Sequence, residues 1–108
     1  MGAPALKHDV FQAIADPTRR RLLRLLADKE MPVAAITECF PITRTAVNKH
    51  LTVLSDAGLV HSQKVGRETR YRLQPEPLTE IREWLSFFEA YWDDKLSALK
   101  DLVEADND

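Results

Sequence analysis

The chain has 108 residues, of which 44% are hydrophobic and 30% are charged, and its formal net charge is −2. This size and composition predict one soluble domain, residues 1–108, with a modest core. No apolar run approaches the length of a membrane span, and the beginning of the chain lacks the apolar core of a signal peptide. A single cysteine excludes an intramolecular disulfide, so we expect a cytoplasmic protein without membrane contact.

The small net charge hides an asymmetry along the chain. Residues 1–75 carry 12 Lys and Arg against 7 Asp and Glu, a net of +5, whereas residues 76–108 carry 3 against 10, a net of −7. Such a division is typical of a basic body that faces nucleic acid and an acidic element that points elsewhere.

A first helix is predicted from apolar residues at helical spacing, and it ends near Ala15: Leu6, Val10, Phe11 and Ile14. A second helix is predicted to begin at Asp16, whose carboxylate suits the N-cap, with Pro17 at the first helical position. Four leucines form its buried face, and four arginines its exterior: Leu22, Leu23, Leu25 and Leu26, and Arg19, Arg20, Arg21 and Arg24. We expect these arginines to pair with carboxylates or to cover the surface, with direct contact to a phosphate as the alternative.

A short third helix is predicted before Pro41, where it would brace the helix that follows: Val33, Ala34, Ile36 and Phe40. Cys39 lies near its end, beside Glu38. No cation adjoins this cysteine to activate its thiol, so we expect a buried structural cysteine rather than a redox switch.

A fourth helix, which we call the reading helix, is predicted between Thr43 and Gly58. The Thr43 hydroxyl can cap its first turn, and Gly58 suits the left-handed residue that often follows a helix. Val47, Leu51 and Leu54 form one apolar stripe. The opposite face is polar and holds no acid until the far end of the helix: Arg44, Thr45, Asn48, Lys49, Thr52 and Ser55. A face of this kind predicts contact with the edges of DNA bases.

The residues after Gly58 predict a basic β-hairpin, which we call the wing. Leu59 and Val60 open its first strand, and residues 65–68 read as the turn. The second strand alternates between two faces: Thr69, Tyr71 and Leu73 on one, Arg70 and Arg72 on the other. Four cations of the wing are candidate phosphate contacts, opposed only by Glu68: Lys64, Arg67, Arg70 and Arg72. The alternative is an ordinary edge hairpin that its charge keeps soluble.

A long last helix is predicted from Pro77 to about Glu104. Apolar residues recur along it at spacings of three and four, close to a coiled-coil seam: Leu78, Ile81, Leu85, Phe88, Trp92, Leu96, Leu99 and Val103. At about 1.5 Å per residue such a helix extends roughly 40 Å, too far to be buried against the body. We therefore expect the first seven of these residues to form a homodimer interface, with packing inside one monomer as the alternative.

Three stretches carry a family resemblance. They are Asp16-Pro17-Thr18-Arg19-Arg20, the run AVNKHLTVLSDAGLV from Ala46 to Val60, and Gly66-Arg67 with Tyr71 in the wing. Together they resemble the winged helix-turn-helix of the ArsR family of bacterial transcriptional repressors, over about residues 8–104. The resemblance implies a mainly α fold of about five helices with a small two-stranded wing. It also implies a DNA-binding body at about residues 6–75 and dimerisation through a terminal helix at about 77–104.

The residues and the resemblance together predict a sequence-specific repressor that binds a palindromic operator on double-stranded DNA as a homodimer. The predicted DNA contacts lie on the reading helix and the wing: Thr43, Arg44, Thr45, Asn48, Lys49, His50, Lys64, Arg67 and Arg70. Arg44, Asn48 and Lys49 are the base readers, because Arg or Lys suits guanine and Asn suits adenine. His50 either donates to a phosphate or bonds a backbone carbonyl at the edge of the core. The alternative function is a winged-helix protein-interaction module that does not read DNA.

The chain departs from the metal-sensing motifs of the family. ArsR-like metal sensors carry a Cys-x-Cys-type pair on the helix before the reading helix, or His and carboxylate ligands on the last helix. Here only Cys39 lies near the first place, and His8, His50 and His61 all lie outside the last helix. We therefore expect no metal site and no cofactor. Without a phosphate-binding glycine loop or a nucleophile elbow, we also expect no catalytic residues, and no residue pattern identifies an effector.

Overall fold

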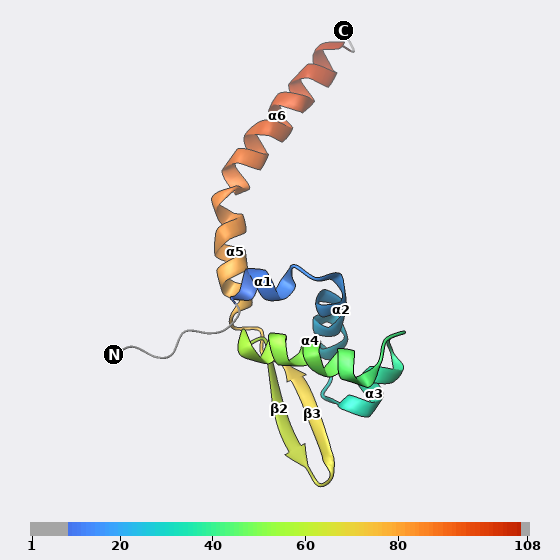
Figure 1. The fold of residues 1–108 in the computed structure, drawn as a ribbon. Helices are drawn as coiled ribbons and strands as arrows, with labels where there is room; N and C mark the ends of the chain where they lie inside the picture. The colour runs from blue at the N-terminus through green and yellow to red at the C-terminus, as the bar shows by residue number, and fades with distance from the viewer. Residues whose placement is uncertain (1–8, 107–108) are drawn as a thin grey trace, which may run out of the picture. The chain divides into compact units, whose positions relative to one another are not determined.

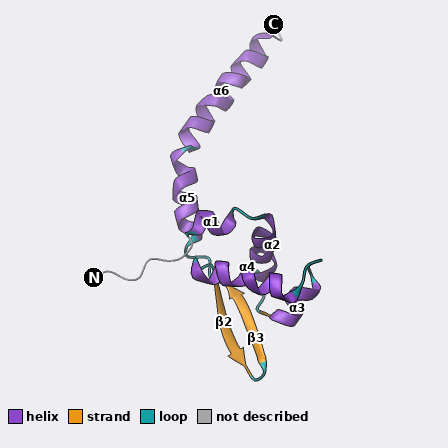
Figure 2. Ribbon diagram, viewed as in Figure 1, coloured by secondary structure: helices purple, strands orange, loops and turns teal. Residues whose placement is uncertain are grey.

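The computed structural model describes residues 9–106, which form six helices and a three-stranded sheet (Figures 1 and 2). The elements are α1 (Val10–Ile14), α2 (Pro17–Leu26), β1 (Met31–Pro32), α3 (Val33–Glu38), α4 (Arg44–Asp56), β2 (Val60–Val65), β3 (Glu68–Leu73), α5 (Leu78–Phe87) and α6 (Glu89–Asp106). This mainly helical fold with a basic hairpin confirms the predicted winged helix-turn-helix. Leu6 and His8 lie outside the described residues, and the described helix α1 begins at Val10, after its N-cap Asp9.

The chain divides into two compact units, Met1–Leu78 and Thr79–Asp108. The first unit holds α1 to α4 and the sheet, and the second holds most of α5 and all of α6. Within residues 9–106, no helix is long and apolar enough to cross a bilayer.

The helix α2 begins as the sequence predicts. The Asp16 carboxylate accepts a hydrogen bond from the Arg19 backbone N–H at 3.0 Å, and Pro17 occupies the first helical position. Its buried face is narrower than expected, because Leu25 is only half-buried while the other three leucines are buried. At 3.6 residues per turn, Leu22, Leu23 and Leu26 share one stripe and Leu25 lies at its edge.

The reading helix is α4, and its predicted cap and core stripe are confirmed. The Thr43 hydroxyl accepts a hydrogen bond from the Ala46 N–H at 3.1 Å. Gly58 follows the helix with φ +76°, a backbone conformation in which an added Cβ is strained. The stripe completes a core whose largest members are fully buried: Leu22, Leu26, Ile36, Val47, Leu51, Leu54 and Leu59.

The wing is larger than the predicted hairpin. The strands β2 and β3 pair antiparallel from Val60 opposite Leu73 to Val65 opposite Glu68, with Gly66 at φ +62° in the turn. The strand β1 then pairs with β3, so the sheet order is β1-β3-β2 and Met31 lies opposite Tyr71. A strand of two residues has no readable alternation, which is why the sequence did not reveal it. Its Pro32 lacks an N–H and is tolerated because β1 is an edge strand.

The predicted continuous last helix is wrong in one respect: it is interrupted at Phe88, between α5 and α6. The Phe88 N–H donates to the Leu85 carbonyl, three residues back, which tightens the turn. The Ser86 hydroxyl donates to the Glu83 carbonyl at 2.9 Å and competes with the helical bonding there, a contact that bends helices. No glycine or proline marks this position in the sequence.

Candidate nucleic-acid interface

The polar face of α4 is exposed, as the sequence predicts. Arg44, Thr45, Asn48, Lys49 and Thr52 are all exposed, and they lie opposite the buried stripe, whereas Ser55 is half-buried. No hydrogen bond or ion pair joins the side chains of Arg44, Asn48 or Lys49 to another residue in the described part of the chain. Their donors and acceptors therefore face water, which a DNA groove can replace.

Two threonine hydroxyls of this face already have backbone partners. The Thr43 hydroxyl accepts the cap bond from Ala46, so its proton is left as a donor toward solvent. The Thr52 hydroxyl donates to the Asn48 carbonyl at 2.9 Å. These bonds fix both side chains at the edges of the exposed face.

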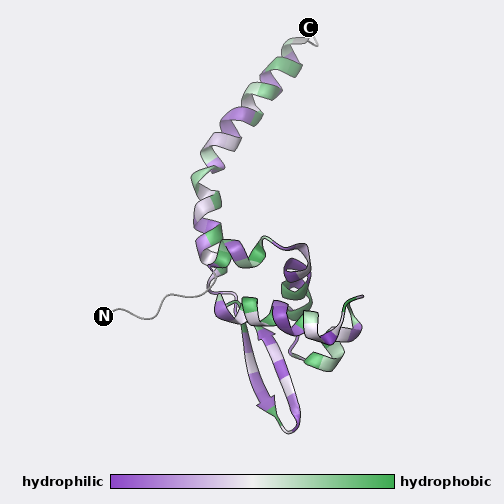
Figure 3. Cartoon of the chain, in the orientation of Figure 1, coloured by the Kyte–Doolittle hydropathy of each residue, from purple (hydrophilic) through white to green (hydrophobic). Residues whose placement is uncertain are grey.

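The wing carries cations on an exposed hairpin whose strands are mainly hydrophilic (Figure 3). Lys64 lies opposite Thr69 near the tip, and Arg67 lies in the turn after Gly66. Between residues 9 and 106, neither cation forms an ion pair. Both charges are therefore available to a phosphate backbone.

Arg70 is the wing cation with protein partners. Its guanidinium lies 3.7 Å from the Glu30 carboxylate and 3.4 Å from the Glu68 carboxylate. The expectation that only Glu68 opposes the wing cations is therefore wrong, since Glu30 also faces Arg70. Glu30 precedes β1, and because this strand was not predicted, its proximity to the wing was not either.

The reading helix and the wing meet in one hollow. Arg44, the first residue of α4, and Arg67, in the wing turn, both line it. The remaining lining comes from the end of β1, the start of α3 and the start of β3: Pro32, Val33, Ala34, Glu68 and Thr69. Two arginines that are distant in sequence thus border the same concave, solvent-open surface.

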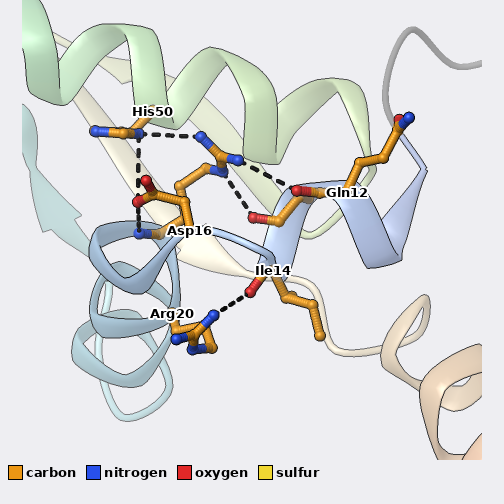
Figure 4. A network of polar contacts seen from close by, with 7 residues as sticks. Gln12, Ile14, Asp16, Arg20 and His50 are labelled. Atoms are coloured by element: carbon orange, nitrogen blue, oxygen red, sulfur yellow. Dashed lines mark hydrogen bonds and ion pairs between the residues drawn. The ribbon is translucent and has the colours of Figure 1, made fainter.

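His50, on α4, contacts a side chain of α2 and the side chain that caps α2, rather than a backbone carbonyl (Figure 4). Its Nδ1 lies 3.3 Å from Nη1 of Arg19 and 4.0 Å from a carboxylate oxygen of Asp16. The Arg19 guanidinium also donates to the end of α1, through Nε to the Ala13 carbonyl at 2.7 Å and through Nη2 to the Gln12 carbonyl at 3.2 Å. This network joins three helices, and sequence spacing gave no signal for it.

The same network lowers the pKa of Asp16. Burial is the largest single influence and would raise the pKa, but several smaller influences that lower the pKa together outweigh it, led by the hydrogen bond from the Arg19 backbone N–H. The nearby His50 and Arg19 side chains and the Thr18 N–H supply the rest of the lowering. Asp16 therefore favours its ionised form in the folded protein.

The arginines of α2 divide into two pairs. The guanidinium groups of Arg19 and Arg20 donate to backbone carbonyls of the α1 segment, and that of Arg20 reaches the Ile14 carbonyl at 2.6 Å. Arg21 and Arg24 are exposed and make no ion pair within residues 9–106. The predicted partners of the first pair were carboxylates, whereas the structure shows carbonyl oxygens at a helix end, which attract cations.

Cys39 is exposed, so the expected buried structural cysteine is wrong. The helix α3 ends at Glu38, one residue before Cys39. The Cys39 thiol points toward the Ala35 carbonyl oxygen, 3.5 Å away. Throughout the described part of the chain, no three His, Cys, Asp or Glu side chains are grouped to hold a metal ion.

In the second unit, apolar side chains are exposed along both helices. Trp92, Leu96 and Leu99 are 57%, 61% and 58% exposed, and Leu85 is 51% exposed. Ile81 and Phe88 are half-buried, as is Leu78 at the end of the first unit. Phe88 packs edge-on against Trp84 and Phe87, with ring centroids 5.1 and 5.0 Å apart.

A capped helix-turn-helix with an unpaired polar face, beside a basic wing, defines a winged helix-turn-helix domain. A family model described as a helix-turn-helix domain matches residues 14–63. The transcriptional regulator Rv2034 of Mycobacterium tuberculosis is 34% identical over 98 residues, 91% of this chain and 89% of that protein. The transcriptional repressor SdpR of Bacillus subtilis is 33% identical, over 75% of this chain and 90% of its own.

Solved structures agree with these sequence relatives. An ArsR-like transcriptional regulator from Rhodococcus sp. RHA1 matches with a TM-score of 0.70 and 38% identity, over 89% of this chain and 88% of that one. The chain belongs to the ArsR family of DNA-binding transcriptional regulators, and it is a regulator rather than an enzyme.

Proposed function

We propose that this regulator is a cytoplasmic repressor that binds a palindromic operator as a homodimer. The observation that carries the proposal is the unpaired polar face of α4 beside the unpaired wing cations Lys64 and Arg67. The free-energy cost of moving a charged side chain from water onto DNA is smallest when the side chain has no protein partner, because no internal ion pair must break.

The proposed contacts sort into two kinds. Arg44, Asn48 and Lys49 reach base edges in the major groove, where a bidentate contact discriminates between bases. Thr43 and Thr45 reach the same groove beside these base readers, and His50 binds a phosphate of the DNA backbone. On the wing, Lys64 and Arg67 bind flanking phosphates, and Arg70 contributes to the same field while it stays bound to its carboxylates.

The exposed apolar residues of α5 and α6 support the proposed dimer. Monomers rarely leave so large an apolar surface in water, and the surface includes four residues of the seam predicted from spacing: Leu85, Trp92, Leu96 and Leu99. The half-buried Leu78, Ile81 and Phe88 complete the proposed interface. A two-fold dimer would place two reading helices in successive major grooves, about 34 Å apart.

Selection from a random-sequence DNA pool tests this function. We expect the protein to recover duplexes that share an inverted repeat, with half-sites centred about one helical turn apart. A promoter that contains this repeat should be transcribed less in vitro when the protein is added. Recovery of no common sequence, or of a single half-site only, contradicts the proposed palindromic binding.

A further inference from the structure

We propose that Arg19 is a positioning residue of the DNA interface: it holds His50 in the tautomer whose proton is on Nε2, so that this nitrogen donates to a DNA phosphate. The inference rests on the proposed DNA binding and adds to it a residue outside the reading helix. In this arrangement Arg19 acts through His50 and does not touch DNA.

The direction of the Arg19 guanidinium is set by α1. Its Nε donates to the Ala13 carbonyl at 2.7 Å, and its Nη2 donates to the Gln12 carbonyl at 3.2 Å. Because the guanidinium is a rigid planar fork, two bonds to adjacent carbonyls fix its plane. The remaining nitrogen, Nη1, is then directed at Nδ1 of His50, 3.3 Å away.

This contact determines the tautomer of His50. A guanidinium in a protein is always charged and can only donate hydrogen bonds, so Nδ1 must be the acceptor. A neutral imidazole that accepts at Nδ1 carries its proton on Nε2. Asp16 does not reverse this choice, because its nearest oxygen lies 4.0 Å from Nδ1, beyond hydrogen-bonding distance.

The other ring nitrogen of His50 points away from Asp16 in Figure 4. The His50 side chain is 24% exposed, and within residues 9–106 no hydrogen bond is formed by its Nε2. His50 directly follows Lys49 on α4, a residue of the exposed polar face. An outward N–H donor beside that face suits a phosphate oxygen, which only accepts.

Substitutions at the two residues test whether they act as one. The probe is the duplex that the wild-type protein recovers from a random pool. Arg19→Gln and His50→Ala should each weaken its binding roughly fivefold, the worth of one hydrogen bond. The double variant should bind no more weakly than His50→Ala alone. Additive losses would overturn the proposal, because they would show that Arg19 acts independently of His50.

Arg20→Gln is the matched control, since Arg20 also donates from α2 to the α1 segment, at Ile14, but does not contact His50. We expect it to bind the duplex as the wild-type protein does. Arg19→Gln should leave the dependence of binding on salt unchanged. A slope reduced by about 0.9 would show that Arg19 itself neutralises a phosphate, which overturns the positioning role.

A second pair of variants remains informative even if Arg19→Gln unfolds. The amide nitrogen of glutamine can occupy the place of Nε2, whereas that of asparagine corresponds to Nδ1. His50→Gln should therefore retain most of the affinity, and His50→Asn should lose as much as His50→Ala. Equal binding by the Gln and Asn variants would contradict a donor at Nε2.

Nuclear magnetic resonance of the free protein tests the tautomer without DNA. Long-range proton–nitrogen correlations of His50 should show the Nε2–H form in the wild-type and Arg20→Gln proteins, and a larger share of Nδ1–H in Arg19→Gln. A wild-type protein mainly in the Nδ1–H form overturns the inference. If the protein selects no DNA, the proposed function fails, and these spectra still decide the tautomer.

Discussion

The Arg70 guanidinium binds Glu30 twice: its Nε lies 3.7 Å from the carboxylate, and its Nη2 donates to the carbonyl oxygen at 3.5 Å. These contacts tie β3 to the residue before β1, and Glu68 binds the same guanidinium from within β3. A cation that the sequence assigns to DNA is thus partly neutralised by two carboxylates. The wing therefore contributes a smaller positive field than its sequence suggests.

Glu30→Gln removes one of these opposing charges and should strengthen DNA binding. We expect about a twofold gain in affinity at roughly 0.1 M salt, because one screened charge near a phosphate is removed. Stability should change by less than about 1 kcal/mol, as for other partly exposed ion pairs. Glu76→Gln, which removes an exposed acid that forms no ion pair with Arg70, is the control for overall charge. Weaker binding by Glu30→Gln would show that Glu30 positions the wing rather than neutralising it.

Asp16→Asn should reduce stability at neutral pH and have less effect in acid. The pKa of Asp16 is lowered from its ordinary value of 3.8, so its ionised form stabilises the fold above that pH. This contribution is lost as the pH falls through the lower, folded-state pKa. Asparagine keeps the N-cap bond to Arg19, so the change isolates the charge. Urea unfolding at pH 7 and pH 3 should show a gap between the two proteins that shrinks in acid, and an equal gap at both would refute this role.

Leu96→Glu should disrupt the proposed dimer. Leu96 is 61% exposed and lies on the predicted seam, so a carboxylate there would be desolvated if two copies pair. Ser97→Glu is the matched control, with the same added charge one residue away on α6. Sedimentation at micromolar concentration should give a dimer for wild-type and Ser97→Glu, and a larger monomer fraction for Leu96→Glu. A wild-type monomer would contradict the dimer directly.

Local features of the fold could be read from the sequence. The caps at Asp16 and Thr43, the left-handed Gly58 and the wing turn all follow from short-range rules, and each is confirmed. The polar face of α4 was also predictable, because helical spacing alone separates it from the buried stripe.

Features that depend on distant partners could not be read in this way. The pairing of Met31 with Tyr71 and the contact of Arg19 with His50 join residues far apart in sequence. The interruption at Phe88 arises from competing hydrogen bonds within ordinary helix-forming residues rather than from a glycine or proline. The exposed Cys39 depends on where α3 ends, a boundary that apolar spacing places only approximately.

Binding of the selected duplex across a range of salt concentrations tests the central claim most directly, with wild-type protein and with Arg44→Ala/Lys49→Ala. The control is Arg21→Ala/Arg24→Ala, which removes the same charge from exposed positions on α2. Wild-type and control affinities should fall steeply with salt, and the Arg44→Ala/Lys49→Ala variant should bind about 100-fold more weakly. Wild-type binding that ignores salt, or unchanged binding by the Arg44→Ala/Lys49→Ala variant, would contradict DNA recognition by α4.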